Sequence, residues 1–565
     1  MTIKRKKKNG RIYLEEYKSI RIDGKVKSIY VRSLGPEDPV ALPTKPKPKA
    51  LDRLEPGPSH RAGAVTLLWE IASQLGFITT IDEICCGEPD IEGPTPGKLL
   101  AAWAINRVID PMSNTLLENW IITTDLPRLM DLNPADLTRQ SFLTAMDFLC
   151  YNDDTSGQLR DYTQQIDEIL YQRWRASHPL KSGETETVAY DLTSILFFGV
   201  SCPLAELGYN SKHVNRLQVN LALLVSKYDK YPISHLIYNG SRNSVSTVKN
   251  LIAKLNEMAI EPGTLIWDRG NVSGEYVNLV ETTGWKLICG IPKSLNDAKN
   301  IIANTEIPLN PDTFISKSRT GHIYATRCQG QLFDKERSVV VYTNHERRTG
   351  KINDRNEVLA YIGEQLNELS EKGKTWSEAR LHKEINTIVG SWKRFFHTRV
   401  KRKGEGPRIE WKFKNQEIAA SEQIYGKYLL ISTDESLPPD EVVKAYFEKD
   451  FVEKVFRRLK TSEELEPVRH RLERRVRVYI FVCVLAYRLL ADLQWRLLQQ
   501  SQRKDIWNDA DGLLLDLERV ERVQVRLGQQ VKIWYLNLTN KSLKTLEVLG
   551  CGDLLKETVE VDFRL

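Results

Sequence analysis

The order of apolar segments between residues 188 and 289 constrains the fold more than any other feature of this sequence. Three segments with strand character come first, and strand-like and helix-like segments then alternate. The expected strands are 188–193, 218–227, 233–238, 264–268 and 286–289, and the expected helices are 244–258 and 273–283. Alternation of this kind indicates crossover helices between strands of one sheet. The chain is therefore expected to be an α/β protein with a mixed sheet.

Two of the expected strands end on an acidic residue. Asp191 and Asp268 each follow an apolar run, at a position where α/β folds place side chains that face a cleft. Either aspartate alone could simply terminate a strand. A third acid, Glu453, lies on a later expected helix, which runs from 441 to 459. Two aspartates and a glutamate make an all-oxygen ligand set, which suits Mg²⁺ or Mn²⁺ rather than zinc.

One face of the 441–459 helix carries an unusual set of side chains. Tyr446, Lys449 and Glu453 are spaced at i, i+3 and i+7, and Arg457 and Lys460 extend the same face. Such a face suits a carboxylate that holds a metal ion beside cations that bind phosphates. The spacing also fits an exposed helix stabilised by ion pairs between residues four apart. The spacing alone leaves both interpretations open.

Positive charge is concentrated in three regions. Residues 1–32 contain eleven Lys and Arg residues against three acids, so the rest of the chain has a net charge of about −1. A second region, 393–414, includes Lys401, Arg402 and Lys403 among aromatic residues, and a third contains five arginines between 469 and 477. Cationic segments with interleaved aromatics suit phosphates and stacked bases, so a polyanion is the expected partner. A merely solubilising N-terminal tail is the alternative for the first region.

Composition excludes several other classes of protein. The longest apolar run, 478–487, is too short to span a bilayer, and we expect no membrane association. No apolar segment follows the basic N-terminus, so a secretory signal is not expected. The eight cysteines are scattered and fit neither a disulfide framework nor a zinc site. These features predict a soluble intracellular protein.

Changes in sequence pattern predict six segments. They are a basic β-hairpin arm with a Pro-rich linker (1–60), a helical DNA-binding or oligomerisation domain (61–180), the first part of the α/β core (181–290), a β-rich insertion (291–425), the second part of the core with the Glu453 helix (426–500), and a C-terminal segment (501–565). The hairpin is expected from two strands, 11–22 and 26–34, on either side of Asp23-Gly24.

The helix pattern resembles a known signature. Tyr446-x2-Lys449-x3-Glu453-x6-Lys460 is similar to the Tyr-x2-Arg-x3-Glu-x6-Lys (YREK) signature of a group of bacterial and archaeal insertion-sequence transposases. Lys449 stands where that family usually has arginine, which keeps the charge but loses bidentate geometry. Further similar blocks are Ala189-Tyr190-Asp191-Leu192-Thr193, Gly208 to Lys212, Asn239-Gly240-Ser241-Arg242, Trp267-Asp268-Arg269-Gly270 and His470 to Arg475.

The resemblance implies a fold and an activity. It implies an RNase H-like core, interrupted by a β-rich insertion, in a DDE transposase that uses two Mg²⁺ or Mn²⁺ ions. Asp191, Asp268 and Glu453 would be both the catalytic residues and the metal ligands. Further residues would bind DNA, namely Tyr446, Lys449, Arg457, Lys460, Arg269, Arg242, Lys401, Arg402 and Lys403.

The resemblance also implies partners and a setting. The DNA would comprise the terminal inverted repeats of an insertion sequence and a target duplex. The enzyme would cut and join strands as a homodimer or larger synaptic assembly in the prokaryotic cytoplasm, associated with the nucleoid. Two alternatives remain: a catalytically silent or domesticated DNA-binding derivative, and an RNase H-like nuclease without strand transfer.

Overall fold

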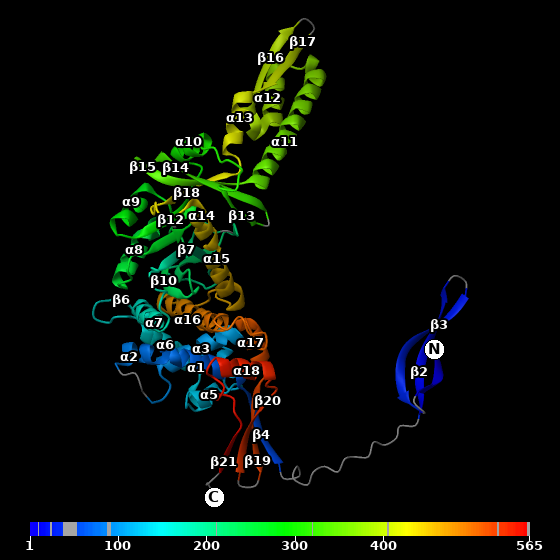
Figure 1. Ribbon diagram of the computed structural model, residues 1–565, viewed down its shortest axis with the longest axis vertical. Coiled ribbons are helices and arrows are strands. Elements are labelled where there is room, and N and C mark those ends of the chain that lie inside the picture. Colours follow the sequence, from blue (N-terminus) through cyan, green and yellow to red (C-terminus); the bar gives the residue numbers. More distant parts are fainter. Residues whose placement is uncertain are drawn as a thin grey trace. The chain divides into compact units, whose positions relative to one another are not determined.

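The structure is a computed structural model that describes residues 1–8, 11–22, 25–37, 54–87, 92–210, 212–243, 245–318, 320–403, 406–527 and 530–561 (Figure 1). The chain forms two compact units. One comprises residues 1–59, 523–534 and 557–565, and the other comprises residues 60–522 and 535–556. The larger unit contains the expected helical segment and the expected α/β core together, so these parts are not separate compact bodies.

The N-terminal hairpin is confirmed and has a third strand. β2 (Arg11–Ile22) pairs antiparallel with β3 (Lys25–Pro36), and β1 (Thr2–Lys8) pairs with the other side of β2. The basic run at the start of the chain is therefore a strand. In its pairing with β2, Lys4 lies opposite Glu15. The expected turn at Asp23-Gly24 and most of the Pro-rich linker lie outside the described residues.

The expected helical segment is confirmed, and it packs on a long buried helix near the C-terminus. That helix, α16 (Glu473–Leu498), contacts α3 and α6 and is buried along most of its length, as expected for a core element. No single described helix is both long and apolar enough to cross a membrane, although α1 and α2, bent by 56°, pass that test as a pair. The segment comprises α1 (Gly63–Gln74), α2 (Phe77–Cys86), α3 (Pro96–Ile109), α4 (Leu117–Ile121), α5 (Leu126–Leu129), α6 (Arg139–Leu149) and α7 (Thr163–Ser177), with a small hairpin of β5 (Cys150–Asn152) and β6 (Leu159–Asp161).

A ten-stranded mixed sheet organises the larger unit, which confirms the expected α/β class. β7 pairs in parallel with β11, and β11 pairs in parallel with β12, whereas the remaining neighbours are antiparallel. The order is β10 (Pro232–Asn239), β9 (Leu217–Ser226), β7 (Thr187–Leu196), β11 (Thr264–Trp267), β12 (Lys286–Ile291), β18 (Lys427–Ser432), β15 (Lys335–Asn344), β14 (Gly321–Leu332) and β13 (Phe314–Ser318), with β8 (Glu206–Leu207) beside β9.

Both faces of this sheet are apolar. Successive residues of a strand point to opposite sides, and consecutive residues of the central strands are apolar. Leu265 and Leu287 belong to the main hydrophobic core, while the adjacent Ile266 and Ile288 pack with Val442 and Val443 of α14 in a second cluster. Helices therefore cover both faces. Those that follow or flank the strands are α8 (Val248–Glu257), α9 (Gly274–Thr282), α10 (Asn296–Asn304), α14 (Pro439–Glu448) and α15 (Asp450–Arg457).

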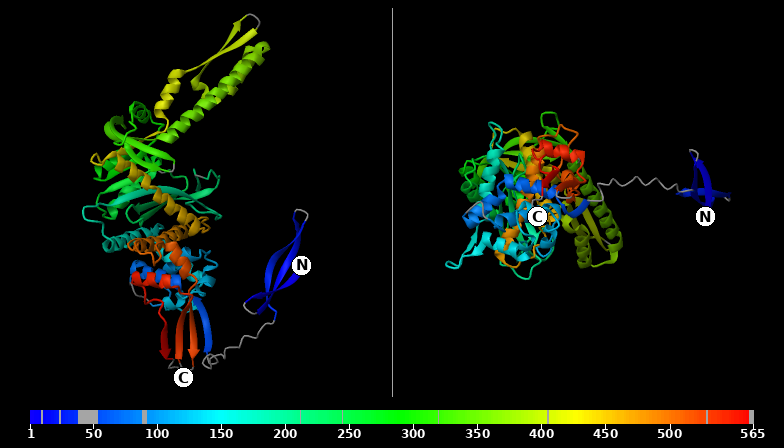
Figure 2. Two further views of the ribbon diagram at one scale, coloured as in Figure 1. Left: turned by 45° about the vertical axis from the view of Figure 1, so that its right-hand side comes forward. Right: turned by 90° about the horizontal axis from the view of Figure 1, so that it is seen from below.

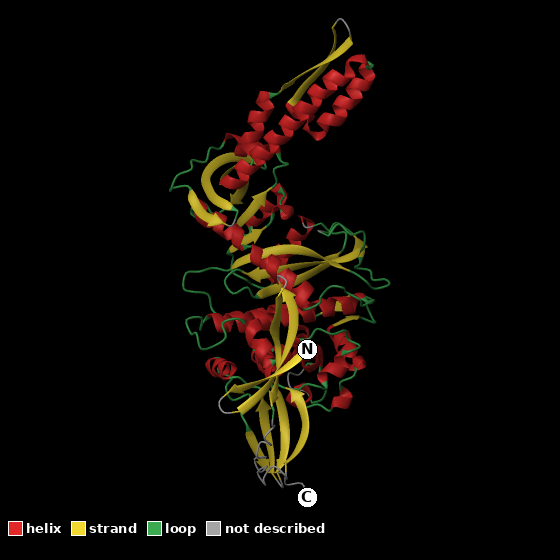
Figure 3. Ribbon diagram, turned by 90° about the vertical axis from the view of Figure 1, so that its right-hand side faces the viewer, coloured by secondary structure: helices red, strands yellow, loops and turns green. Residues whose placement is uncertain are grey.

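The expected insertion at 291–425 divides differently in the structure. Its first part supplies β13, β14 and β15 to the same large sheet, because β15 pairs directly with β18. Only the later part has its own hydrophobic cluster, and it is mainly helical. Figures 2 and 3 show its helices beside a two-stranded hairpin. Its elements are α11 (His345–Lys372), α12 (Glu378–Val389), β16 (Phe396–Lys403), β17 (Gly406–Phe413) and α13 (Asn415–Ile424).

The last segment of the chain mixes helices and strands. A four-stranded sheet has the order β21-β20-β19-β4, so it joins the C-terminal strands to a strand that precedes α1. The elements are β4 (Leu54–Arg61), α17 (Ala510–Leu517), β19 (Glu521–Leu527), β20 (Gln530–Leu536), α18 (Asn540–Val548) and β21 (Thr558–Val561).

Candidate active site

The register of two parallel strands brings Asp191 and Asp268 together. Tyr190 of β7 is the partner of Trp267 of β11, so the next residue on each strand is an aspartate at the same level of the sheet. Asp268 follows the last residue of β11, as expected. Asp191 differs from the expectation, because β7 continues to Leu196 and the aspartate lies in the middle of the strand.

The helical segment after β18 adds the third acid. α14 and α15 meet at Lys449, and α15 lies against β7. A small pocket is lined by Asp191, Asp268 and Glu453, together with Lys449 and Val452. Residues that are 262 positions apart in the sequence therefore share one cavity. The three expected carboxylates converge, and Glu453 is the most exposed of them.

Asp268 is held by a phenol and an ammonium group. The Tyr446 hydroxyl donates a hydrogen bond of 2.7 Å to Asp268 Oδ1, and Lys449 Nζ lies 3.8 Å from the same oxygen. The backbone N–H of Arg269 also donates to Oδ1, at 2.8 Å. Burial alone would raise the pKa of Asp268, but these partners outweigh burial and lower it. Burial and the adjacent carboxylate raise the pKa of Tyr446 well above its ordinary value, so the phenol remains a donor.

A glycine makes room for this hydrogen bond. A Cβ atom at Gly290, on β12, would lie 2.5 Å from the Tyr446 hydroxyl oxygen. Any side chain larger than hydrogen would therefore displace the phenol from its place beside Asp268. Sequence reasoning does not identify Gly290, because a single glycine in a strand has several explanations. The only sequence signal was the position of the glycine next to the end of an apolar run.

Among the described residues, no cation forms an ion pair with Asp191 as Lys449 does with Asp268. Burial raises its pKa to about 6, and the nearby carboxylates of Asp268 and Glu453 add to the rise. The N–H of Leu192, which donates to Asp191 Oδ1 at 2.9 Å, and the charge of Lys449 act in the opposite direction. The electrostatic environment of this pocket therefore disfavours several ionised carboxylates unless further positive charge is supplied.

The ligand set fits a hard divalent cation. The pocket offers three carboxylates and no histidine or cysteine, which is the oxygen-only chemistry that Mg²⁺ and Mn²⁺ prefer. Within the described ranges, no three His, Cys, Asp or Glu side chains are close enough to hold one ion in their present positions. The carboxylates of Asp191, Asp268 and Glu453 would have to move closer together to share an ion.

Some of the expected cationic residues lie near the acidic pocket in space or in sequence, and others do not. Lys460 is close to β7, where its Nζ lies 2.7 Å from Thr193 Oγ1 and 2.5 Å from the Ser194 carbonyl oxygen. Arg457 and Arg269 are both exposed. In the sequence, Arg457 lies four residues after Glu453 and Arg269 directly follows Asp268. The structure does not place Arg242 or Lys401 in the pocket.

Arg242 donates to the Ser246 carbonyl oxygen, and Lys401 forms an ion pair with Glu410 on the β16–β17 hairpin. The side chains of Arg402 and Lys403 lie outside the described part of the chain. The basic hairpin and the acidic pocket are therefore separate features. Whether the hairpin contributes to DNA binding stays a prediction.

Comparison with known proteins gives one family match. No curated protein matches the chain in sequence. Among solved structures, the chain is similar to one in the cryo-EM structure of a piggyBac transposase synaptic complex with hairpin DNA, at 11% identity over 82% of each chain, with a TM-score of 0.38. That likeness is too distant to bear on function. The family model described as the transposase DDE domain matches residues 183–489, which is more than half of the chain and includes all three pocket carboxylates. The chain therefore belongs to the transposase DDE domain family.

Proposed function

We propose that the protein is a cut-and-paste DNA transposase of the YREK group with an RNase H-like catalytic core. It would bind the terminal inverted repeats of an insertion sequence, cut the DNA there and join the freed strand to a target duplex. The convergence of Asp191, Asp268 and Glu453 in one pocket carries this proposal. The family match, which includes these residues, supports it independently of the geometry.

Asp191, Asp268 and Glu453 are the proposed ligands for two divalent ions, Mg²⁺ or Mn²⁺. When bound, such ions supply a nucleophile at neutral pH and stabilise the charge that develops on the attacked phosphate. Asp191 lies close enough to both Asp268 and Glu453 for each to raise its pKa, so it would hold cations together with either of them. Tyr446 and Lys449 orient the Asp268 carboxylate, through the 2.7 Å hydrogen bond and the 3.8 Å ion pair.

The proposed roles of the other cationic residues follow from their exposure and their contacts. Arg269 and Arg457 are exposed and are the proposed contacts to phosphates beside the pocket. Lys460 holds the end of the Glu453 helix against β7, through Thr193 and Ser194. Arg242, Lys401, Arg402 and Lys403 would contact more distant parts of the DNA. Two DNA ends must be held together for transfer, so a homodimer or larger synaptic assembly is proposed.

A cleavage assay with matched variants tests this function. The substrate is duplex DNA that contains the inverted repeat flanking the gene, with Mg²⁺ added. Glu453→Gln should abolish cutting and leave DNA binding intact, because it removes a ligand and no phosphate contact. Asp450→Asn is the control, since Asp450 is an exposed acid on the same helix that does not line the pocket.

The products separate the three candidate functions. Cut ends that become joined to a second duplex support a transposase. Cut ends that are never joined support a nuclease without strand transfer. Specific binding with no cutting by the wild type, under conditions that supply both DNA ends, supports a DNA-binding derivative. Loss of binding in Glu453→Gln would contradict the assignment of that residue as a metal ligand.

A further inference from the structure

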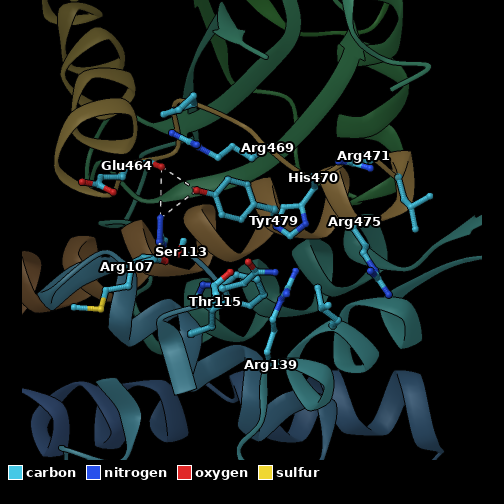
Figure 4. Close-up of a pocket in the computed structure, with 16 residues that line it drawn as sticks. Arg107, Ser113, Thr115, Arg139, Glu464, Arg469, His470, Arg471, Arg475 and Tyr479 are labelled. Atoms are coloured by element: carbon cyan, nitrogen blue, oxygen red, sulfur yellow. Dashed lines mark hydrogen bonds between the residues drawn. The ribbon is translucent and has the colours of Figure 1, made fainter. Parts of the chain in front are cut away.

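A cavity larger than the acidic pocket, with no lining residue in common with it, lies elsewhere in the described part of the chain. It has a volume of about 890 Å³ and lies between the helical segment and the loop that leads into α16 (Figure 4). Arg139, at the start of α6, lines one side, and Arg469, His470 and Arg471 line the other. A volume of this size is typical of sites for small molecules or groups. The only carboxylate in its lining is that of Glu464.

The arginines near this cavity differ in their partners. Arg474 and Arg475 both donate to the Asp147 carboxylate, at 2.6–3.0 Å, and Arg477 pairs with Glu473 at 2.8 Å. These guanidinium groups are already neutralised within the fold. The acidic partners explain how Arg474, Arg475 and Arg477 can pack against other parts of the protein.

Three other arginines have no such partner. Arg139, Arg469 and Arg471 are exposed, and within the described ranges no carboxylate forms an ion pair with any of them, in contrast to their neighbours on α16. Figure 4 shows Arg139 opposite Arg469 and Arg471 across the cavity. Like charges around one cavity repel each other at a cost that an anion between them would remove. The side chains are therefore arranged to accept an anion from outside the chain.

The cavity also offers a hydrogen-bond donor, and Glu464 is the one acidic residue among the described residues that line it. Trp103 is fully buried and lines the cavity, and its indole N–H has no partner among the described residues. Burial, with the nearby charges of Arg475 and Arg107, lowers the pKa of His470 to about 4, so the imidazole is neutral at pH 7. Arg107 is committed to backbone carbonyls of residues 463 and 464 and to the Tyr479 hydroxyl.

The loop that carries Arg469 and Arg471 is connected to the strand of Asp191. The backbone N–H of Phe198, just beyond the end of β7, donates to the Val468 carbonyl oxygen at 2.8 Å, and Phe197 and Val468 form a β-bridge. The same loop begins where the Glu453 helix ends. An anion bound by Arg469 and Arg471 would therefore lie on a segment directly joined to both sides of the acidic pocket.

We propose that this cavity binds a phosphate group through Arg139, Arg469 and Arg471. Guanidinium groups match phosphate oxygens with paired hydrogen bonds, which makes arginine the usual residue for this ligand. The phosphate belongs either to a DNA strand or to a free nucleotide. DNA is the source that the proposed function favours, and only that choice of source rests on the proposed function.

Two binding measurements on the full-length chain test the proposal. The variant is Arg469→Ala/Arg471→Ala, and the control is Arg503→Ala/Lys504→Ala, which removes two exposed positive charges from the loop after α16. The first measurement is the affinity for a duplex oligonucleotide as salt is varied. Each lost phosphate contact lowers the slope of log K against log salt by about 0.9, so the variant should lose about 2 from the slope and the control none. The second is calorimetric titration with pyrophosphate.

The outcomes separate the two sources of phosphate. A reduced salt slope in the variant alone identifies a DNA phosphate. Pyrophosphate binding that the variant alone loses, with an unchanged DNA slope, identifies a free nucleotide or another small phosphate. If the variant and the wild type bind both probes equally, the proposal is wrong. Thermal unfolding of each variant checks that the exposed substitutions leave the fold intact.

These results do not depend on the catalytic proposal. If the wild-type protein never cuts DNA but this variant still loses phosphate binding, only the proposed catalytic function is wrong. A chain that cuts DNA but binds both probes normally in the variant would contradict the cavity proposal alone.

Discussion

Two clusters of charged side chains in the larger unit contrast sharply. In the first, Asp167, His235 and Arg488 are all 0% exposed, and Asp167 lies 2.6 Å from His235 Nδ1 and 2.9 Å from Arg488 Nη1. In the second, the Asp268 carboxylate is 42% exposed and its ammonium partner, Lys449, is 3.8 Å away. The first cluster connects α7, β10 and α16, whereas the second borders an open pocket.

The two clusters differ in how their carboxylates are compensated, which distinguishes a cluster that stabilises the fold from one that can bind a ligand. Burial would raise the pKa of Asp167, but the charges of Arg488 and His235 outweigh it and hold the pKa well below its usual range. The acidic pocket instead retains an excess of carboxylates, and the pKa of Asp191 is raised to about 6. A cluster in which the buried carboxylate has a close cation needs no ion from outside the chain, whereas a pocket with an excess of carboxylates is suited to binding a cation.

Breaking the structural cluster should have the largest effect on stability. Arg488→Met leaves Asp167 buried with His235 as its remaining partner, and loss of one member of a buried ion pair costs about 3–5 kcal/mol. The midpoint of urea unfolding should fall accordingly. Arg503→Met is the control, because its pair with Asp505 is exposed and screened by solvent, so its loss should barely move the unfolding midpoint. Equal shifts in the two variants would contradict the contrast.

Removing a carboxylate from the acidic pocket should affect activity and not stability. Asp191→Asn removes a charge whose burial is unfavourable in the isolated protein, so the unfolding midpoint should stay the same or rise. The cleavage rate should fall by at least about 10²–10³, the usual cost of losing one preorganised electrostatic group. Gel-based cleavage kinetics and urea unfolding measure the two effects. A variant that cuts normally would exclude Asp191 from the catalytic set.

Glu463 extends the comparison. In the part of the chain that the structure describes, it is a buried acid that neither forms a close ion pair, as Asp167 does, nor borders the acidic pocket, as Asp191 does. Both carboxyl oxygens of Glu463 are buried without a hydrogen-bond partner among the described residues, and burial raises its pKa to about 8. The folded protein therefore holds a proton that the unfolded chain releases near pH 4.5. Stability from this group is fully present below that pH and is lost as the pH rises through about 8.

Glu463→Gln should make stability less dependent on pH in that window. The difference in unfolding free energy should amount to a few kcal/mol at most, since one pKa unit corresponds to about 1.4 kcal/mol. Urea unfolding at pH 5 and pH 8 measures it. Glu464→Gln is the control, because the adjacent side chain is exposed. An unchanged pH dependence in Glu463→Gln would show that the carboxyl is ionised in the folded protein.

The smallest effect is expected at Tyr446. Tyr446→Phe removes one hydrogen bond to a carboxylate, an interaction that contributes about 1.5–3 kcal/mol, so cleavage should slow by roughly tenfold to a hundredfold. Stability should change little, because the ring and its packing remain. DNA affinity should also be unchanged, which distinguishes a residue that orients Asp268 from one that binds phosphate. A loss of affinity with normal cleavage at saturating DNA would reverse that assignment.

Local patterns predicted the strands of the core well, because β9, β10, β11 and β12 are short apolar runs bounded by turns. They could not predict where β7 ends. Thr193, Ile195 and Leu196 are β-branched or apolar residues that continue the strand past Asp191. The parallel register that aligns the two aspartates is likewise a long-range property.

Long-range contacts account for the other differences. The pairing of β15 with β18 joins segments about 90 residues apart, and it turned part of an expected insertion into sheet. The helix pattern around Glu453 predicted one helix from 441 to 459, which the structure divides into α14 and α15 at Lys449. The pattern could not predict that Tyr446 and Lys449 both contact Asp268. In the same way, no local pattern connects Arg139 to Arg469 and Arg471, because α6 and the loop before α16 meet only in the folded chain.

The missing side chain at Gly290 has a practical consequence. A methyl group there would push the Tyr446 phenol away from Asp268 and leave every carboxylate and every cation of the pocket in the sequence. Gly290→Ala would therefore slow the reaction sterically, by about as much as Tyr446→Phe. Because every proposed metal ligand remains, such a variant would be suited to trapping the proposed assembly with DNA before cleavage.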